Sequence, residues 1–353
     1  MTSLQQVLDS AVGNGTAPGA AALVARGDDV EIASAGELEP DSIVRLASTT
    51  KPIAAAAVML LVDEGLVALD DPISPWLPEL ASPQVVRTPE SPIDDVVPAA
   101  RPITVEDILT FRAGWGFPSD FSLPAVVELL QRLPVFGLRE TPDEWLTTLA
   151  AIPMLRQPGE AWLYNTCSDI QGVLVARVSG QPLPDFLAER IFRPLGMTDT
   201  DFHVPPEKHH RLAAYHGGDA MPIDGDLWKG PPIFPSGSGG LASTLADWHR
   251  FGRMLLAEGD GLLSPESVRL MTTDHLTREQ RDASTLFLEG AGWGFGGAVE
   301  PDGRYGWIGG TGTSAHVAPS TDTVGILLTQ VQMTSPVPPP LMRAFWSYAF
   351  GAS

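Results

Sequence analysis

Two residues in this sequence have types and a spacing suited to covalent chemistry: Ser48 and Lys51, in the stretch S-T-T-K (48–51). Side chains three residues apart on a helix lie on one face, about 5–6 Å apart at Cβ, so the lysine amine can reach the serine hydroxyl. A serine hydroxyl becomes a nucleophile when a neighbouring base takes its proton. The pair therefore indicates a serine activated for acyl transfer.

The surroundings of Lys51 favour that interpretation over an accidental one. Ser48 could merely cap a helix whose first turn contains Pro52. The chain has three lysines, however, and Lys51 is followed by a stretch without charge that runs to Val62. A protonated lysine, with an ordinary pKa of about 10.4, is costly in apolar surroundings, whereas a neutral lysine is a base.

Two other segments could complete the chemistry, although each also has a purely structural explanation. Tyr164 lies in an expected loop after P-G-E-A-W-L (158–163) and is either a core tyrosine or the third member of a Ser/Lys/Tyr group. The glycines of G-G-T-G (309–312), close to Trp307, either bend a strand tightly or let a substrate approach backbone N–H groups. An oxyanion hole requires such an approach.

No motif predicts a metal or an organic cofactor. The histidines of K-H-H (208–210) and H-G-G (216–218) do not have the spacing of metal ligands. The sequence contains no P-loop and no dinucleotide-binding glycine motif after a strand. The absence of a G-x-S-x-G elbow disfavours the common α/β-hydrolase arrangement. We therefore expect a reaction that needs no metal and no cofactor.

Composition restricts the partners of this chain of 353 residues. Its net charge of −21 disfavours nucleic acid and anionic membrane surfaces as partners. The longest apolar run, Ile53 to Val62, is shorter than the ~20 residues that cross a bilayer. The N-terminus lacks the pattern of a signal peptide and Cys167 is the only cysteine, so the expected location is the cytoplasm. We expect a small-molecule substrate, and the sequence does not predict an oligomeric state.

The pattern of apolar residues predicts strands near both ends of the chain and helices between them. Ala20 to Ala25 and Val30 to Ala35 suggest a hairpin, and Thr323 to Val331 a further strand. Helix patterns with Pro, Gly or polar boundaries cover residues 4–12, 104–111, 124–133, 143–152, 169–178, 185–191, 244–258, 265–272 and 341–350. Residues 72–102 and 199–235 read as irregular connections. We expect an α/β fold in which residues 1–72 and 236–353 form a sheet domain and residues 73–235 form a mostly helical lobe.

Taken in order, the motifs resemble the class C β-lactamase-like serine hydrolases, and family VIII carboxylesterases most closely. The similarity runs from about residue 10 to residue 330 and rests on S-T-T-K (48–51), L-D-D-P (69–72), I-T-V-E-D-I-L-T (103–110), P-G-E-A-W-L-Y (158–164), Y-N-T (164–166), P-L-G-M-T-D-T (194–200), S-G-G-L-A-S-T (238–244) and W-I-G-G (307–310). The resemblance implies the β-lactamase/transpeptidase-like fold, an antiparallel sheet flanked by helices. We expect the active site in the cleft between the two lobes, where ligand sites often form.

Carried over to this sequence, the resemblance makes Ser48 the acylated nucleophile and Lys51 the group that activates it. Tyr164 becomes a shared general base and later the acid that protonates the leaving group. The N–H groups of Ser48 and Gly310 form the implied oxyanion hole. The implied substrate contacts are Asn165, Thr166, Trp307 and Gly309.

Two positions depart from the family pattern. The tyrosine motif usually has Asn or Ser two residues after Tyr, whereas here Thr166 holds that place and Asn165 comes one residue early. Trp307 stands where the β-lactamases and peptidases carry the lysine of a K-T-G motif, which helps to bind a substrate carboxylate. An indole removes that cation and adds apolar area. Further aromatic residues expected at the cleft are Trp115, Phe117, Trp228 and Phe234.

The expected function is therefore hydrolysis of neutral carboxylic esters by a serine hydrolase. A β-lactamase or D,D-peptidase-like amide hydrolase, and an acyltransferase of the same fold, remain the alternatives.

Overall fold

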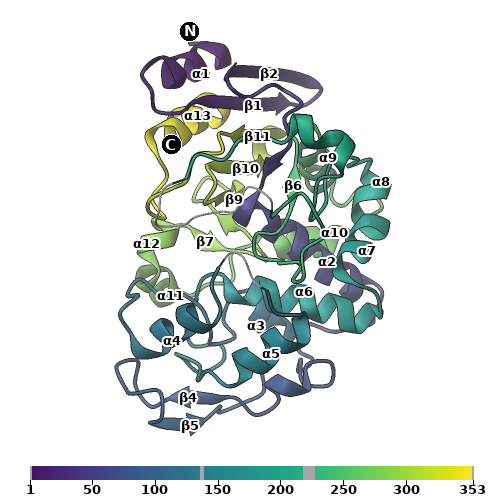
Figure 1. The fold of residues 1–353 in the computed structure, drawn as a ribbon. Helices are drawn as coiled ribbons and strands as arrows, with labels where there is room; N and C mark the ends of the chain where they lie inside the picture. Colours follow the sequence, from purple (N-terminus) through teal and green to yellow (C-terminus); the bar gives the residue numbers. More distant parts are fainter. Residues whose placement is uncertain (1, 136–138, 218–226, 352–353) are drawn as a thin grey trace.

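The computed structural model describes residues 2–135, 139–217 and 227–351, and an antiparallel sheet of seven strands is the main feature of this part of the chain (Figure 1). The strand order is β2-β1-β11-β10-β9-β8-β7, so the first strands of the chain pair with the last ones. The strands are β1 (Gly19–Arg26), β2 (Asp29–Gly36), β7 (Gly292–Trp293), β8 (Ala298–Val299), β9 (Tyr305–Gly309), β10 (Thr313–Ala318) and β11 (Thr323–Leu328). The predicted hairpin and the predicted sheet built from both ends of the chain are confirmed.

Helices account for most of the remaining regular structure. They are α1 (Leu4–Gly13), α2 (Lys51–Asp63), α3 (Val105–Leu109), α4 (Pro124–Arg132), α5 (Pro142–Ala150), α6 (Thr166–Ser179), α7 (Leu183–Leu187), α8 (Arg193–Leu195), α9 (Leu245–Leu256), α10 (Pro265–Met271), α11 (Arg278–Ala283), α12 (Thr285–Leu288) and α13 (Pro340–Phe350). Two short pairs of strands, β3 (Val44–Arg45) with β6 (Ala242–Ser243) and β4 (Gln84–Val86) with β5 (Val96–Pro98), lie outside the main sheet.

The side chains of β1 alternate between two apolar layers. Ala22 and Val24 pack into the cluster formed with α1 and α13, whereas Leu23 and Ala25 belong to the main core. This alternation follows from the two-residue repeat of a strand. Helices α1 and α13 cover one face of the sheet and α9 packs on the other (Figure 1). Both faces of the central strands are therefore buried, whereas the edge strand β2 is partly exposed.

Several predicted boundaries differ from the structure. The last strand ends at Leu328 instead of Val331, because Gln330 has a left-handed backbone with φ of 55° that turns the chain out of the sheet. The supposedly irregular residues 72–102 contain the β4–β5 hairpin. The helix predicted over 185–191 is α7 followed by a π-helical turn (Ala188–Phe192). Part of the predicted loop 199–235, residues 218–226, lies outside the described residues.

Helix α2 carries Lys51 through the middle of the molecule. Its residues from Lys51 to Leu61 are all buried, as expected of a helix that is apolar on every side. The short side chains of residues 54–57 let α6 pack closely against it. Ser48 precedes α2 in a 3-10 turn (Ala47–Thr50) and is the one residue between positions 42 and 61 that is not buried. The serine is thus partly exposed, in the turn directly before the first residue of a buried helix.

Helices α3, α4 and α5 and the β4–β5 hairpin lie at the end of the molecule opposite the two termini (Figure 1). The division of the chain at residues 72 and 236 into two domains stays a prediction. Among the described residues, none of the helices combines the length and apolar character that crossing a membrane requires.

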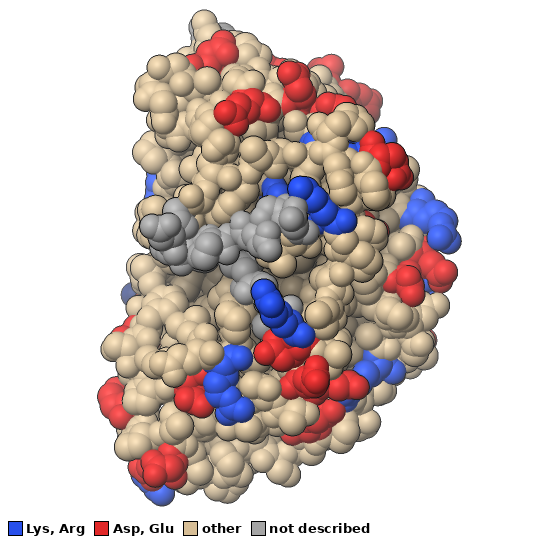
Figure 2. All heavy atoms as spheres, in the orientation of Figure 1, with Lys and Arg blue, Asp and Glu red and all other residues tan. Residues whose placement is uncertain are grey.

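Charged side chains of both signs are interspersed over the face shown in Figure 2. Ion pairs among the described residues include Arg177 with Glu79 at 2.7 Å and Arg211 with Asp199 at 3.0 Å. The acidic side chains on the face shown do not form a single patch.

Candidate active site

The amine of Lys51 lies at the centre of the site. Its Nζ is 2.9 Å from Ser48 Oγ, 2.9 Å from Asn165 Oδ1 and 2.6 Å from the backbone oxygen of Ser238. The side chain is completely buried, and this burial lowers the pKa of Lys51 to about 7, while the charge of Asp169 acts in the opposite direction. The amine can therefore lose its proton near neutral pH and accept one from Ser48.

Tyr164 faces both members of this pair. The centre of its ring lies 4.8 Å from Lys51 Nζ, and its hydroxyl accepts a hydrogen bond of 2.6 Å from Trp307 Nε1. Burial raises the pKa of Tyr164 to about 12, and hydrogen bonds with Ser48 and Trp307 lower it by less. The phenol therefore keeps its proton at neutral pH, which suits a donor better than a base.

The backbone is strained next to both polar side chains. Ala47, directly before Ser48, has φ of 47°, and Asn165, directly after Tyr164, has φ of 84° and ψ of −64°. Residues with a Cβ atom seldom adopt positive φ, at a cost of about 1–2 kcal/mol, and such strain tends to collect at functional sites. At Asn165 a bond of 3.3 Å from Thr166 N to Tyr164 O closes a three-residue turn. This turn lets the side chain of Asn165 reach Lys51.

The residues predicted to contact substrate are not all in one place. Trp307, Asn165 and Gly310 line a cavity together with Ser48 and Tyr164. Gly309 and Thr166 are not among the described residues that line it, and their contact with substrate stays a prediction. A Cβ atom on Gly309 would lie 2.3 Å from the backbone oxygen of Leu46, so this glycine lets β9 pack against the chain next to Ser48. Thr166 is buried as the first residue of α6.

The cavity over Ser48 has a volume of about 270 Å³ and mostly apolar walls. The ring of Phe287 lies 4.7 Å from that of Tyr164, centre to centre. The other apolar side chains in the walls are Phe117, Phe121, Val135, Ile308, Met333 and Pro336. Sequence reasoning found Phe117 but missed Phe287 and Met333, which lie in segments without a recognisable motif. The site therefore offers an apolar surface to a substrate.

Three of the aromatic residues expected at the cleft lie elsewhere. Trp115 is buried and donates from Nε1 to the backbone oxygen of Ile152 at 2.8 Å. Trp228 belongs to a separate apolar cluster with Ile43. The ring of Phe234 packs against the indole ring of Trp145. Their aromatic type did not indicate which part of the chain each ring packs against.

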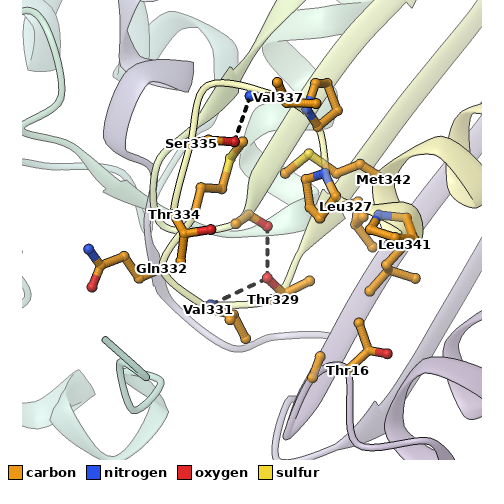
Figure 3. Close-up of a pocket in the computed structure, with 16 residues that line it drawn as sticks. Thr16, Leu327, Thr329, Val331, Gln332, Thr334, Ser335, Val337, Leu341 and Met342 are labelled. Carbon is orange, nitrogen blue, oxygen red and sulfur yellow. Dashed lines mark hydrogen bonds between the residues drawn. The ribbon is translucent and has the colours of Figure 1, made fainter. Parts of the chain in front are cut away.

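A second cavity of about 340 Å³ shares the residues Met333, Thr334 and Ser335 with the cavity over Ser48 (Figure 3). None of the described residues that line it has an ionisable side chain. Met333 N donates to the backbone oxygen of Gly310 at 2.8 Å, which ties the shared segment to the cavity over Ser48. Among the described residues, no three His, Cys, Asp or Glu side chains are grouped so that they could hold a metal ion. The cavity over Ser48 is therefore the candidate active site.

Comparisons with known proteins cover most of the chain. The model of the beta-lactamase family matches residues 4–341. Protein Rv1367c of Mycobacterium tuberculosis (strain ATCC 25618 / H37Rv) is 40% identical over 318 residues, which cover 83% of this chain and 78% of that protein. Esterase EstB of Burkholderia gladioli is 32% identical over 326 residues, with the same coverage of 83% and 78%. The solved structure of EstCE1, described as a hydrolase with promiscuous acyltransferase activity, matches with a TM-score of 0.83 and 23% identity over 98% of this chain and 97% of EstCE1.

Proposed function

This chain is a serine hydrolase that belongs to the beta-lactamase family, and we propose that it hydrolyses small, uncharged carboxylic esters through a covalent acyl-enzyme on Ser48. The family resemblance and the β-lactamase/transpeptidase-like fold predicted from the sequence are confirmed. One observation carries the proposal: the buried amine of Lys51 lies 2.9 Å from Ser48 Oγ beside an apolar cavity.

In the first step, neutral Lys51 takes the proton of Ser48 while Oγ attacks the carbonyl carbon of the ester. A neutral amine has one lone pair and two N–H groups. The three contacts of Lys51 match this number, because the lone pair can face Ser48 while the N–H groups donate to Asn165 Oδ1 and Ser238 O. The amine is then held in the orientation that proton transfer needs.

The tetrahedral intermediate carries a negative charge on the former carbonyl oxygen. We assign its stabilisation to the N–H groups of Ser48 and Gly310. The hydrogen bond from Met333 N to the carbonyl of Gly310 supports this role, since it fixes the orientation of that residue.

Collapse of the intermediate requires a proton on the leaving alcohol. Of the two roles implied for Tyr164 by resemblance, we assign the acid, because burial raises the pKa of this residue to about 12 and the phenol is protonated. Tyr164 gives its proton to the alcohol and regains one from the Lys51 ammonium. A water molecule then attacks the acyl carbon while Lys51 takes one of its protons. When the bond between the acyl carbon and Ser48 Oγ breaks, the Lys51 ammonium returns this proton to Oγ, which frees the acid and restores neutral Lys51 and the Ser48 hydroxyl.

The preference for uncharged esters rests on the lining of the cavity. No Lys or Arg is among the described residues that line it. A charge-assisted hydrogen bond to a carboxylate contributes about 1.5–3 kcal/mol, so a substrate with a carboxylate near the scissile bond forgoes that contribution here. This argues for esters ahead of β-lactams and D-alanyl peptides, which carry such a carboxylate.

Labelling with a fluorophosphonate tests the nucleophile. We expect one adduct on the peptide that contains Ser48 and none in Ser48→Ala, whereas an adduct on Ser236 or Ser238 would overturn the assignment. Turnover of p-nitrophenyl butyrate and of nitrocefin tests the substrate class. A kcat/KM for nitrocefin equal to or above that for the ester would favour β-lactamase activity over esterase activity as the function of this chain.

A further inference from the structure

We propose that Asp169 is a positioning residue of the active site, which holds the backbone of Ser238 so that its carbonyl orients the amine of Lys51. The inference rests on the proposed role of Lys51 as the base. Asp169 was not singled out from the sequence, where it is one acidic residue near the start of a helix.

A short chain of hydrogen bonds joins Asp169 to Lys51. Asp169 is 5% exposed. Its Oδ1 atom accepts a hydrogen bond of 2.7 Å from Ser236 Oγ and one of 3.0 Å from Ser238 N. The carbonyl of Ser238 in turn accepts a hydrogen bond of 2.6 Å from Lys51 Nζ. Both backbone groups of Ser238 are therefore fixed, one by the acid and one by the amine.

The packing of residues 236–238 leaves little freedom for another arrangement. A Cβ atom on Gly237 would lie 2.3 Å from the backbone oxygen of Ser168, so this segment lies directly against the first turn of α6. The hydroxyls of Ser236 and Ser238 are 3.0 Å apart. A buried carboxylate is costly unless it is hydrogen-bonded or paired, and this segment supplies hydrogen bonds to it.

Asp169 also acts on Lys51 through its charge. Burial raises the pKa of the Asp169 carboxyl, while hydrogen bonds from Ser236 and Ser238 and the charge of Lys51 lower it. Conversely, the Asp169 charge raises the pKa of Lys51 against the dominant effect of burial. A negative charge at Asp169 therefore keeps the pKa of the amine near neutrality, where a base is most effective.

The other ionisable groups on α2 and on the elements packed against it are neutral phenols or thiols, or have partners of their own. These groups are Tyr164, Cys167, Tyr305, Asp63 with Ser264 and Ser267, Arg177 with Glu79 and Asp143, and Glu266 with Arg269. Among the described residues, Asp169 is thus the charged group that acts on the amine of Lys51.

The substitution Asp169→Asn tests the proposal, because it keeps the size of the side chain and an oxygen that can accept from residues 236 and 238, but removes the charge. Loss of the charge lowers the pKa of Lys51. The acid limb of the kcat/KM profile for p-nitrophenyl butyrate should therefore move to lower pH, by about one unit. Ser236→Ala removes a hydrogen bond that lowers the pKa of Asp169, so a smaller fraction of Asp169 is charged at a given pH. The acid limb should therefore move in the same direction as in Asp169→Asn, but by less.

Asp63→Asn is a matched control. Its carboxylate lies at the other end of α2 and also accepts from two serine hydroxyls and a backbone N–H. This variant should keep the wild-type pH profile. An acid limb that stays in place in both Asp169→Asn and Ser236→Ala would overturn the proposal, even if both rates fall. If Asp169→Asn does not fold, the profile of Ser236→Ala decides alone.

Failure of this inference can be told apart from failure of the proposed function. Fluorophosphonate labelling of Ser48 in the wild-type protein reports on the function. Normal labelling with an unmoved acid limb would contradict the role of Asp169 only, whereas a wild-type protein without labelling would contradict the role of Ser48.

Discussion

The indole nitrogen of Trp307 donates a hydrogen bond of 2.6 Å to the hydroxyl oxygen of Tyr164. Trp307 is 5% exposed, and its ring also meets that of Trp293 edge to face at 4.8 Å. Trp307 therefore contributes more than apolar surface. Its N–H occupies a lone pair of the phenol oxygen and leaves the phenol proton free to point away from the indole.

Trp307→Phe should lower kcat for p-nitrophenyl butyrate about three- to tenfold, because the phenol loses a hydrogen bond with a net contribution of about 0.5–1.5 kcal/mol. Trp293→Phe is the matched control, since Trp293 is also a buried indole in the same aromatic group but its Nε1 has no hydrogen-bond partner among the described residues. Steady-state kinetics of both variants make the comparison. Equal losses in the two variants would assign the effect to packing instead of the hydrogen bond.

The pH dependence of the wild-type enzyme should reflect Lys51. Burial lowers the pKa of Lys51 to about 7, and only the neutral amine can accept a proton from Ser48. Below pH 7 we therefore expect kcat/KM to fall with decreasing pH, by about tenfold for each unit well below the pKa. A profile recorded between pH 5 and 9 makes the measurement. An activity that is flat from pH 5 upward would contradict Lys51 as the base.

Lys51→Ala and Tyr164→Phe should each lower the rate of ester hydrolysis by about 10²-fold or more, since proton transfer contributes ~10²–10⁴. The double variant should be little worse than either single one, because both residues serve one proton-transfer unit. Circular dichroism checks that each variant is folded. Tyr164→Phe with near wild-type activity would support the alternative that Tyr164 is only a core residue.

Asn165 allows the strain and the contact with Lys51 to be separated. Asn165→Ala and Asn165→Gly both remove the Oδ1 acceptor of Lys51, so both should lower kcat, by about tenfold for a lost hydrogen bond to a charged or reacting group. At φ of 84°, however, glycine is not strained, so Asn165→Gly should be about 1 kcal/mol more stable than Asn165→Ala. Urea denaturation measures this difference. If Asn165→Ala were instead more stable than Asn165→Gly, the three-residue turn at position 165 would not keep its positive φ in the alanine variant.

The apolar wall should set the preferred acyl length. Phe121 lines the cavity over Ser48 and is 39% exposed, so Phe121→Ala enlarges the cavity at its open side. Burial of each further methylene contributes about 0.8 kcal/mol, and we expect the ratio of kcat/KM for decanoate to that for butyrate esters to rise about tenfold. Val337→Ala, in the lining of the second cavity, is the control and should leave the ratio unchanged. An equal rise of this ratio in Phe121→Ala and Val337→Ala would contradict the proposal that the wall of the cavity over Ser48 sets the preferred acyl length.

The sequence alone determined the parts of this site that depend on local geometry. Ser48 and Lys51 are three residues apart, so a helical turn brings them together whatever surrounds it, and their contact could be predicted. The hairpin of β1 and β2 was equally predictable, because its strands are short apolar runs that are neighbours in the chain around G-D-D (27–29). The order of the motifs was sufficient to identify the family and the fold.

Tertiary structure decided everything that depends on segments far apart in the chain. Asn165 and Ser238 reach Lys51 from more than a hundred residues away, and no local pattern indicates that their oxygens point at the amine. Gly309 packs against the backbone of Leu46 and Thr166 is buried at the start of α6, and their residue types alone did not indicate these positions. The role inferred for Asp169 could not be predicted from the sequence for the same reason. The pKa of a carboxylate or an amine depends on how deeply the folded chain buries the group and on which charged groups lie next to it.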